Sequence, residues 1–196
     1  MPTPRLRRGA RGLAALLAVA ACADPTPAPE PPPAPTARPD LPPDTLDVQG
    51  VARAVARVEP AGDGRARGTV RLTQTEAGVR VQAELAGLSE SGFHGLQVLR
   101  GRDCSADPAL HLGAETGAPH GGPYSLPGQR HAGDLGNVRG DGGEGRYDRI
   151  DPVLSLSGTG SAVGRAVVVR AGRDDAASPD GAAGSVVGCG VLEPAG

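Results

Sequence analysis

Four histidines, all between positions 94 and 131, have the clearest capacity for chemistry in this sequence. Three of them are His111, His120 and His131, and Asp134 follows the last by three residues. Three imidazole nitrogens and one carboxylate oxygen satisfy Zn²⁺ in tetrahedral geometry. Four protein ligands leave no open position for water, so such a site is structural rather than hydrolytic. The spacing predicts one zinc site; the alternative is a set of solvated histidines in a glycine-rich loop.

Other chemistries are disfavoured by the composition. All 20 cationic side chains are arginine, which excludes lysine nucleophiles, and the formal net charge of −2 with 2% aromatic residues argues against a nucleic-acid partner. Ser125 could join His131 and Asp134 in a hydrolytic triad, but its surroundings do not resemble a nucleophile elbow. The glycine-rich segment 140–145 lacks a lysine and favours a hairpin turn over a phosphate-binding loop.

The first 21 residues have the pattern of an export signal. Four arginines precede an apolar run, Leu13–Ala21, that is shorter than the roughly 20 residues needed to span a bilayer. Small residues then stand directly before Cys22, as in the lipobox of a bacterial lipoprotein. We expect residues 1–21 to be a signal peptide and Cys22 to carry the lipid that anchors the chain to a membrane of the cell envelope, facing the periplasm or the exterior. The alternative is an ordinary signal peptide in which Cys22 is incidental.

Residues 22–49 are dominated by proline, with ten of the chain's 20 prolines between Ala23 and Gln49. Such a segment cannot bury enough apolar surface to offset its ordering entropy. Proline biases it to an extended conformation of about 3.1 Å per residue. This segment is predicted to be a tether, and a docking site for a proline-binding partner is the alternative.

Residues 50–194 are predicted to form one all-β domain. Short runs of alternating apolar and polar residues are separated by Gly, Asp and Ser clusters, as in a sandwich or barrel. These runs are 51–58, 68–74, 78–85, 94–100, 152–158, 163–170 and 186–192. Two stretches carry no strand pattern, 101–130 and 171–185, and loops of this length in a compact domain are usually functional. With Cys22 set aside, Cys104 and Cys189 remain; in an exported protein a disulfide is expected, and two free thiols are the alternative.

A series of short segments in this domain follows one order along the chain. They are Gly92-Phe93-His94-Gly95, Asp103-Cys104-Ser105, His111, Ala118-Pro119-His120-Gly121-Gly122-Pro123, Arg130-His131-Ala132-Gly133-Asp134-Leu135-Gly136-Asn137-Val138, Leu154-Ser155-Leu156-Ser157-Gly158, Val163-Gly164-Arg165, Asp174-Asp175 and Gly188-Cys189-Gly190-Val191. In this order they resemble the copper/zinc superoxide dismutase family.

The resemblance implies a fold and a metal site. The fold would be an eight-stranded Greek-key sandwich or flattened barrel with two long loops. Zinc would be bound by His111, His120, His131 and Asp134, a disulfide would join Cys104 to Cys189, and Asp174 would orient a zinc-bound histidine from behind. One departure from the family is that Leu-Gly-Ala follows His111 where Phe-Asn-Pro is usual.

The copper half of the family's site is missing from this sequence. By the resemblance, the positions of the copper-only ligands are occupied by Gln97, Leu99 and Arg170, while His94 matches a histidine that braces the backbone. Leucine has no lone pair and arginine keeps its proton, so neither binds copper. Val186 stands where the family places an arginine that guides superoxide.

We therefore expect a zinc-binding, superoxide dismutase-like lipoprotein without dismutase activity, with copper absent. Dismutation needs a centre with two oxidation states, and Zn²⁺ has one. The alternative is a true dismutase with a non-standard metal site; a copper-handling module is disfavoured because the chain has no Cys-x-x-Cys and a single methionine, Met1. Arg170 either fills the vacated copper position and donates to Gln97 or a nearby carbonyl, or points to solvent.

Overall fold

The computed structural model describes residues 50–105 and 110–196. The predicted signal peptide, the lipidated Cys22 and the tether 22–49 therefore lie outside the described residues. In the described part no helix is both long and apolar enough to cross a bilayer. The helical content there is one short 3-10 turn, η1 (Ala114–Thr116).

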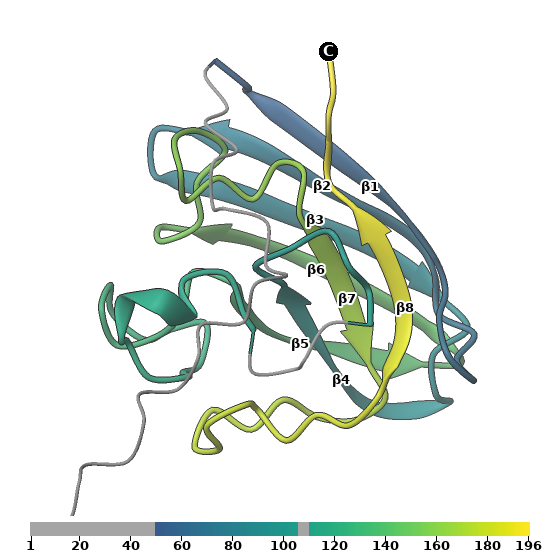
Figure 1. Ribbon diagram of the computed structural model, residues 1–196. Helices are drawn as coiled ribbons and strands as arrows, with labels where there is room; N and C mark the ends of the chain where they lie inside the picture. The colour runs from purple at the N-terminus through teal and green to yellow at the C-terminus, as the bar shows by residue number, and fades with distance from the viewer. Residues whose placement is uncertain (1–49, 106–109) are drawn as a thin grey trace, which may run out of the picture. The chain divides into compact units, whose positions relative to one another are not determined.

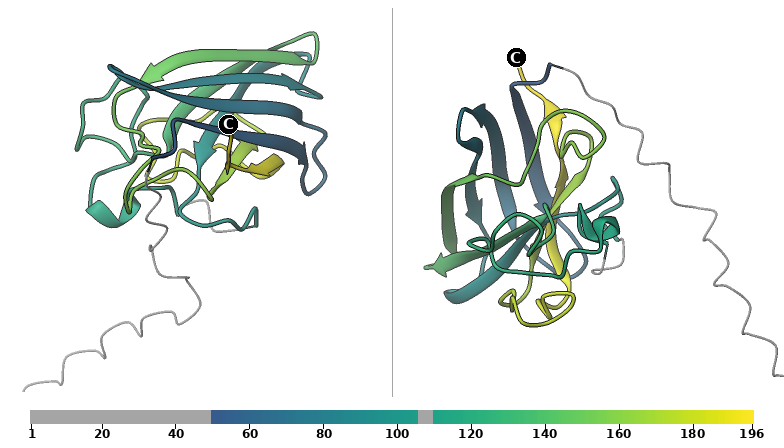
Figure 2. Two further views of the ribbon diagram at one scale, coloured as in Figure 1. Left: turned by 90° about the horizontal axis from the view of Figure 1, so that it is seen from above. Right: turned by 90° about the vertical axis from the view of Figure 1, so that its left-hand side faces the viewer.

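The described residues form an antiparallel barrel (Figures 1 and 2). The strands are β1 (Arg53–Pro60), β2 (Arg67–Thr75), β3 (Gly78–Ala86), β4 (Ser91–Val98), β5 (Asp134–Asp141), β6 (Glu144–Asp151), β7 (Ala166–Arg170), β8 (Val186–Val191) and the two-residue β9 (Glu193–Pro194). Their order in the sheet is β2-β3-β6-β5-β4-β7-β8-β1-β9, and a further pairing of β2 with β1 closes the barrel. The predicted all-β, eight-stranded Greek-key architecture is confirmed, with β9 as a short addition that pairs with β1.

The core follows from the alternation of side chains along each strand. In β3 every second residue is buried, and Val79 and Val81 are fully enclosed. In β4 the inward residues are Leu96 and Val98, so Gln97 between them faces the outside of the barrel. Gln97 is nevertheless 0% exposed, because long loops cover this face of the strand. Three of the four candidate metal ligands belong to one of these loops.

Strand β7 is buried on both faces, in agreement with the four apolar residues that precede Arg170 at its end. Val167 and Val169 belong to the main core, whereas Ala166 and Val168 pack in a second apolar cluster with Leu99. The segment that follows β4 covers this second cluster and is tied to β8 by a disulfide.

The predicted disulfide is confirmed. Cys104 and Cys189 are bonded, with a Cα–Cα distance of 5.9 Å and a sequence separation of 85 residues. Cys189 is on β8, and Cys104 is in the loop between β4 and β5 that carries the candidate metal ligands. The disulfide therefore anchors the start of that loop to the barrel.

The strand predictions were wrong in two places. The run 152–158 is not a strand; it contains bends and isolated bridge residues, among them Ser155, which pairs with Ser161. Strands β5 and β6 were not predicted, since their sequences DLGNVRGD and EGRYDRID are rich in glycine and charge. The glycine-rich segment between them is the hairpin turn expected from the sequence, with Asp141 paired to Glu144.

The two stretches without a strand pattern are indeed loops in the described residues. One joins β4 to β5 and contains η1; the other joins β7 to β8. Strand β4 lies between β5 and β7 in the sheet. The first loop leads into β5 and the second leaves β7, so the two loops reach β4 from opposite sides. The backbone N–H of Gly95 on β4 donates to the carbonyl of Gly172 at 2.8 Å, which holds the second loop against the strand.

Candidate metal centre

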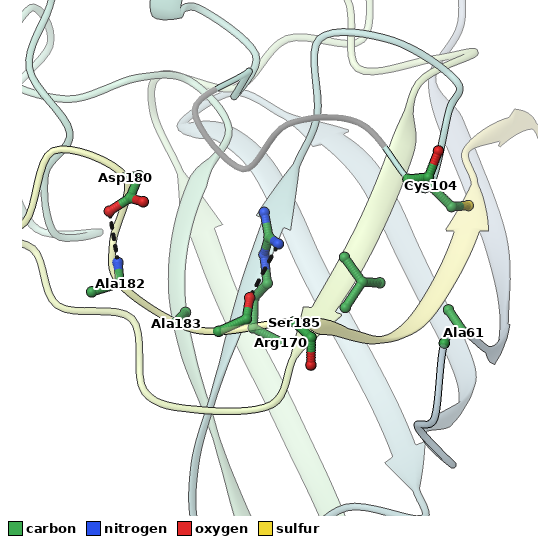
Figure 3. Close-up of a pocket in the computed structure, with 11 residues that line it drawn as sticks. Ala61, Cys104, Arg170, Asp180, Ala182, Ala183 and Ser185 are labelled. Carbon is green, nitrogen blue, oxygen red and sulfur yellow. Dashed lines mark hydrogen bonds between the residues drawn. The ribbon is translucent and has the colours of Figure 1, made fainter.

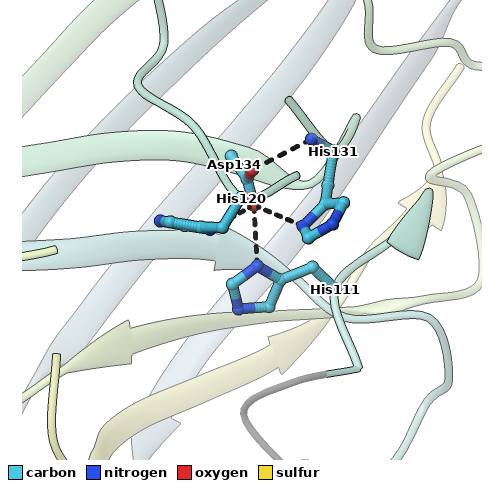
Figure 4. Close-up of side chains that lie close together, drawn as sticks. All are labelled: His111, His120, His131 and Asp134. Atoms are coloured by element: carbon cyan, nitrogen blue, oxygen red, sulfur yellow. Dashed lines mark hydrogen bonds and ion pairs between the residues drawn. The ribbon is translucent and has the colours of Figure 1, made fainter. Parts of the chain in front are cut away.

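The structure brings together four of the residues singled out from the sequence: His111, His120, His131 and Asp134 (Figure 4). The three histidines come from the loop between β4 and β5, and Asp134 is the first residue of β5. His111 also forms a bridge with Leu99, so its backbone is fixed against the end of β4. All four residues are buried, with His111 and Asp134 at 0% exposure.

Asp134 is the centre of this cluster. Its Oδ1 lies 2.7 Å from Nδ1 of His111, 3.1 Å from Nδ1 of His120 and 3.4 Å from Nδ1 of His131. Its Oδ2 accepts backbone N–H bonds from Gly121 at 3.0 Å and from His131 at 2.9 Å. These two bonds fix the carboxylate plane, so that one oxygen faces three imidazole nitrogens.

A divalent metal ion fits this donor set. One ligand atom from each of the four residues lies within 4.8 Å of every other. A tetrahedral zinc ion with bonds of about 2.0–2.1 Å needs ligand atoms roughly 3.3 Å apart, which the separations around Asp134 Oδ1 bracket. Nδ1 of His131 is also buried with no hydrogen-bond partner in the described structure. Buried nitrogens without a partner are costly unless something binds them.

The charges in the cluster reinforce one another. Burial raises the pKa of Asp134, but hydrogen bonds from His111 and His120 outweigh it and hold that pKa well below its usual range. Burial lowers the pKa of His120, but hydrogen bonds to Asp134 and Asp174 outweigh it and raise that pKa to about 9. The cluster is therefore an anionic pocket that favours a cation, either a proton or a metal ion.

A buried ion pair holds the turn that carries His131 and Asp134. The guanidinium of Arg130, which is 2% exposed, donates to the backbone carbonyls of His131 and Asp134 and pairs with Asp151 at the end of β6. Gly133 lies within the turn, and no side chain fits at this position, because a Cβ there would lie 2.1 Å from the carbonyl oxygen of Val98. The turn is thus fixed on both sides.

Asp174 reaches His120 from the second loop. Its Oδ1 lies 2.8 Å from Nε2 of His120. Its backbone is fixed by Asn137 on β5, which accepts the N–H of Asp174 at 2.7 Å and donates to its carbonyl at 3.0 Å. The sequence analysis identified Asp174 but gave no role to Asn137 or Arg130, although both lie in the segment 130–138 that carries Asp134. The structure shows what they hold: Asn137, on β5, fixes the backbone of Asp174, and Arg130, before β5, fixes the turn with His131 and Asp134.

The three residues at the family's copper positions do not converge on a shared metal site. Gln97 donates from Nε2 to Asp174 Oδ2 at 2.7 Å and accepts at Oε1 from Nε of Arg170 at 2.8 Å. Leu99 packs in the apolar cluster under the disulfide. Arg170 is 3% exposed and also donates to the carbonyl of Gly184, so the expectation that it points to solvent is wrong. Figure 3 shows its side chain beside the segment with Ala183 and Ser185, in the wall of a pocket of about 780 Å³.

Two further positions considered from the sequence lie outside the cluster. His94 bridges two backbone segments: its Nε2 accepts the N–H of Ser89 at 3.2 Å, and its Nδ1 lies 2.8 Å from the carbonyl of Arg170. Val186 begins β8 and lines the same pocket as Arg170.

Comparisons with known proteins agree on one family. The family described as copper/zinc superoxide dismutase (SODC) matches residues 66–192. Superoxide dismutase [Cu-Zn] of Paramecium bursaria Chlorella virus 1 is 32% identical over 159 residues, covering 76% of this chain and 81% of the viral protein. Superoxide dismutase [Cu-Zn] A of Xenopus laevis is 36% identical over 145 residues, covering 67% of this chain and 92% of its own length.

A bacterial relative and a solved structure extend the comparison. Superoxide dismutase [Cu-Zn] of Deinococcus radiodurans is 31% identical over 144 residues, covering 66% of this chain and 79% of that protein. The crystal structure of the clock protein EA4 superposes with a TM-score of 0.64 at 35% identity, covering 74% of this chain and 96% of the other.

Fold, disulfide and the His/Asp cluster together define a superoxide dismutase-like β-barrel with a metal-capable site. With these matches, the chain belongs to the copper/zinc superoxide dismutase family. The resemblance inferred from the sequence motifs is thereby confirmed.

Proposed function

We propose that this chain is a superoxide dismutase-like domain that binds one zinc ion through His111, His120, His131 and Asp134 and has no dismutase activity. The observation that carries the proposal is the state of the residues at the family's copper-only positions. Gln97 and Arg170 hydrogen-bond to each other and Leu99 lies in an apolar cluster, so a copper ion would find no nitrogen donors from these three side chains.

The zinc half is supported by the donor set. Nitrogen and carboxylate ligands in a closed four-ligand arrangement suit a structural zinc ion, which supplies a redox-inert cross-link. His111, His120 and His131 would bind through Nδ1, and Asp134 through Oδ1, because these atoms face one another. The ion would join the loop between β4 and β5 to the barrel. The domain would then act as a binding or structural module.

Metal analysis tests this proposal. The full chain is first loaded with zinc and desalted, then exposed to copper, desalted again and assayed for both metals and for superoxide loss, because Cu²⁺ added together with Zn²⁺ would compete for the same ligands. We expect about one zinc per chain, substoichiometric copper and no catalysed dismutation. His120→Ala serves as the control that removes a ligand. Copper retained at one per chain together with catalysed superoxide loss would refute the proposal.

A dismutase with a non-standard metal site is the second candidate. It is favoured by family membership and by Nε2 of His111, which is buried and has no hydrogen-bond partner among the described residues. A variant with Gln97→His, Leu99→His and Arg170→His supplies the missing donors. If copper binding and activity appear only in this variant, the second candidate fails; if the natural chain already has both, it holds.

We also propose that the chain is a lipoprotein of a bacterial cell envelope. The support is the sequence before Cys22: arginines, a short apolar run and small residues. Mass spectrometry of the mature N-terminus tests it, with Cys22→Ser as the control. A diacylated Cys22 that is absent in the variant is expected, and a mature protein that begins elsewhere without lipid would refute the anchor.

A further inference from the structure

A chain of three buried hydrogen bonds runs from the end of β7 to a ligand of the candidate metal centre. Nε of Arg170 donates to Oε1 of Gln97 at 2.8 Å, and Nε2 of Gln97 donates to Oδ2 of Asp174 at 2.7 Å. Oδ1 of Asp174 lies 2.8 Å from Nε2 of His120. None of the four residues is more than 7% exposed. Bulk water therefore has little access to these bonds.

The direction of each bond is determined by chemistry. A guanidinium only donates, so the amide of Gln97 must turn its oxygen to Arg170 and its nitrogen to Asp174. A flipped amide would place its oxygen against the carboxylate of Asp174 and its NH₂ against a cation. Arg170 thus selects one of two amide orientations that are sterically equivalent.

The same logic continues to the metal centre. A carboxylate only accepts, so Oδ1 of Asp174 accepts a hydrogen bond from Nε2–H of His120. With Nε2 held as the N–H by Asp174, Nδ1, which lies 3.1 Å from Asp134 Oδ1, is the nitrogen that can give its lone pair to a metal ion in place of a proton. A metal ligand of this kind depends on the partner of its other nitrogen.

The backbone contacts of Asp174 leave its carboxylate to be oriented by side chains. Asn137 fixes the main chain of Asp174 through both of its peptide groups. Among the described residues, the carboxylate itself is hydrogen-bonded to two side chains, His120 at Oδ1 and Gln97 at Oδ2. Gln97 is therefore the group that holds the carboxylate from the side opposite His120.

We propose that Gln97 and Arg170 are positioning residues for the metal centre: they hold Asp174 so that His120 presents Nδ1 to zinc. The inference rests on the proposed zinc site for its ligand. In this chain the side chains at two former copper positions would support the remaining metal instead of binding a second one.

The test compares Gln97→Met, which removes the amide at similar volume, with Gln82→Met. Gln82 makes the same kind of bond, from Nε2 to a carboxylate of Asp148 at 3.1 Å, but on the exposed side of β3. Zinc affinity is measured by chelator competition in the full chain. We expect Gln97→Met to bind zinc about tenfold more weakly, which is the lower end of the effect seen when residues that support metal ligands are removed. Gln82→Met should bind zinc like the natural chain.

A second readout separates positioning from folding. Nitrogen-15 NMR of the metal-free and zinc-loaded protein follows the Nε2–H of His120, which we expect to exchange slowly in the natural chain and in Gln82→Met, and rapidly in Gln97→Met. Arg170→Met should act in the same direction, and the double variant should be no weaker than Gln97→Met alone, because both residues act through one chain of bonds. Gln97→Asn, one methylene shorter, replaces Gln97→Met if the latter does not fold.

The outcomes distinguish this inference from the proposed function. If the natural chain binds no zinc, the proposed function fails, and the NMR readout on metal-free protein still decides the positioning role. If zinc binds but Gln97→Met keeps both the affinity within twofold and the slow Nε2–H of His120, the positioning role is refuted. Additive losses in the double variant would refute the coupling of Arg170 to Gln97.

Discussion

Removal of the disulfide gives a prediction whose size follows from the structure. The bond between Cys104 and Cys189 closes a sequence separation of 85 residues, for which the loss of chain entropy in the unfolded state corresponds to about 4.5 kcal/mol at 25 °C. Total stabilities of such domains are about 5–15 kcal/mol. In a Cys22→Ser background, Cys104→Ala with Cys189→Ala should therefore lower the free energy of unfolding by at least about 2 kcal/mol, the lower end of measured effects.

Urea unfolding at equilibrium measures this loss. The slope of the free energy against urea should also rise, since the unfolded chain without the cross-link exposes more surface. The same variant should bind zinc more weakly, because Cys104 anchors the loop that carries His111. A loss below about 1 kcal/mol with an unchanged slope would refute the reasoning that the bond acts on the unfolded state. Unchanged zinc affinity would refute only the link to the loop.

Three further predictions concern buried polar groups. Asp134→Asn removes a direct ligand and should weaken zinc binding, measured by chelator competition, by more than about 100-fold. That figure is the upper end of the effect of losing a residue that only hydrogen-bonds to a ligand. Burial raises the pKa of Tyr147 to about 12, above the unfolded value of about 10, so the free energy of unfolding should fall by about 2–3 kcal/mol as the pH rises from 10 to 12. Arg130→Met leaves Asp151 as a buried, unpaired charge and should cost about 3–5 kcal/mol in urea unfolding.

Each of these has a control. Asp180→Asn removes a carboxylate outside the cluster and should leave zinc binding unchanged. For the alkaline effect, Tyr147→Phe should abolish the fall, whereas Tyr124→Phe, at a site that is 88% exposed, should retain it; equal pH profiles in both would contradict the assignment. For the ion pair, Arg130→Met with Asp151→Asn should recover part of the loss, and a single variant as stable as the natural chain would show that the pair does not hold the turn.

Local sequence patterns predicted much of the barrel because alternation reflects burial. The runs around Val79 and Val81 and around Val167 and Val169 have the apolar spacing of strands that face a core, and both are strands. The pattern failed for β5 and β6, whose glycines and charges give no apolar alternation. These two strands are specified by their neighbours: β5 pairs with β4, and β6 with β3. At 152–158 the pattern predicted a strand that is not there: the alternating leucines are buried, but in an irregular segment.

The sequence by itself was enough to predict a set of residues that can bind a metal ion: His111, His120, His131 and Asp134. Three imidazoles and a carboxylate close together in the sequence are typical zinc ligands. The ordered motifs around them were enough to predict the family. Only the tertiary structure decided that all three Nδ1 atoms face one oxygen of Asp134, and that Arg170 is buried against Gln97. The physical reason is clearest for the contacts from Arg170 to Gln97 and from Gln97 to Asp174, which join residues 73 and 77 positions apart. Their meeting depends on strand order and loop packing, which local sequence patterns do not record.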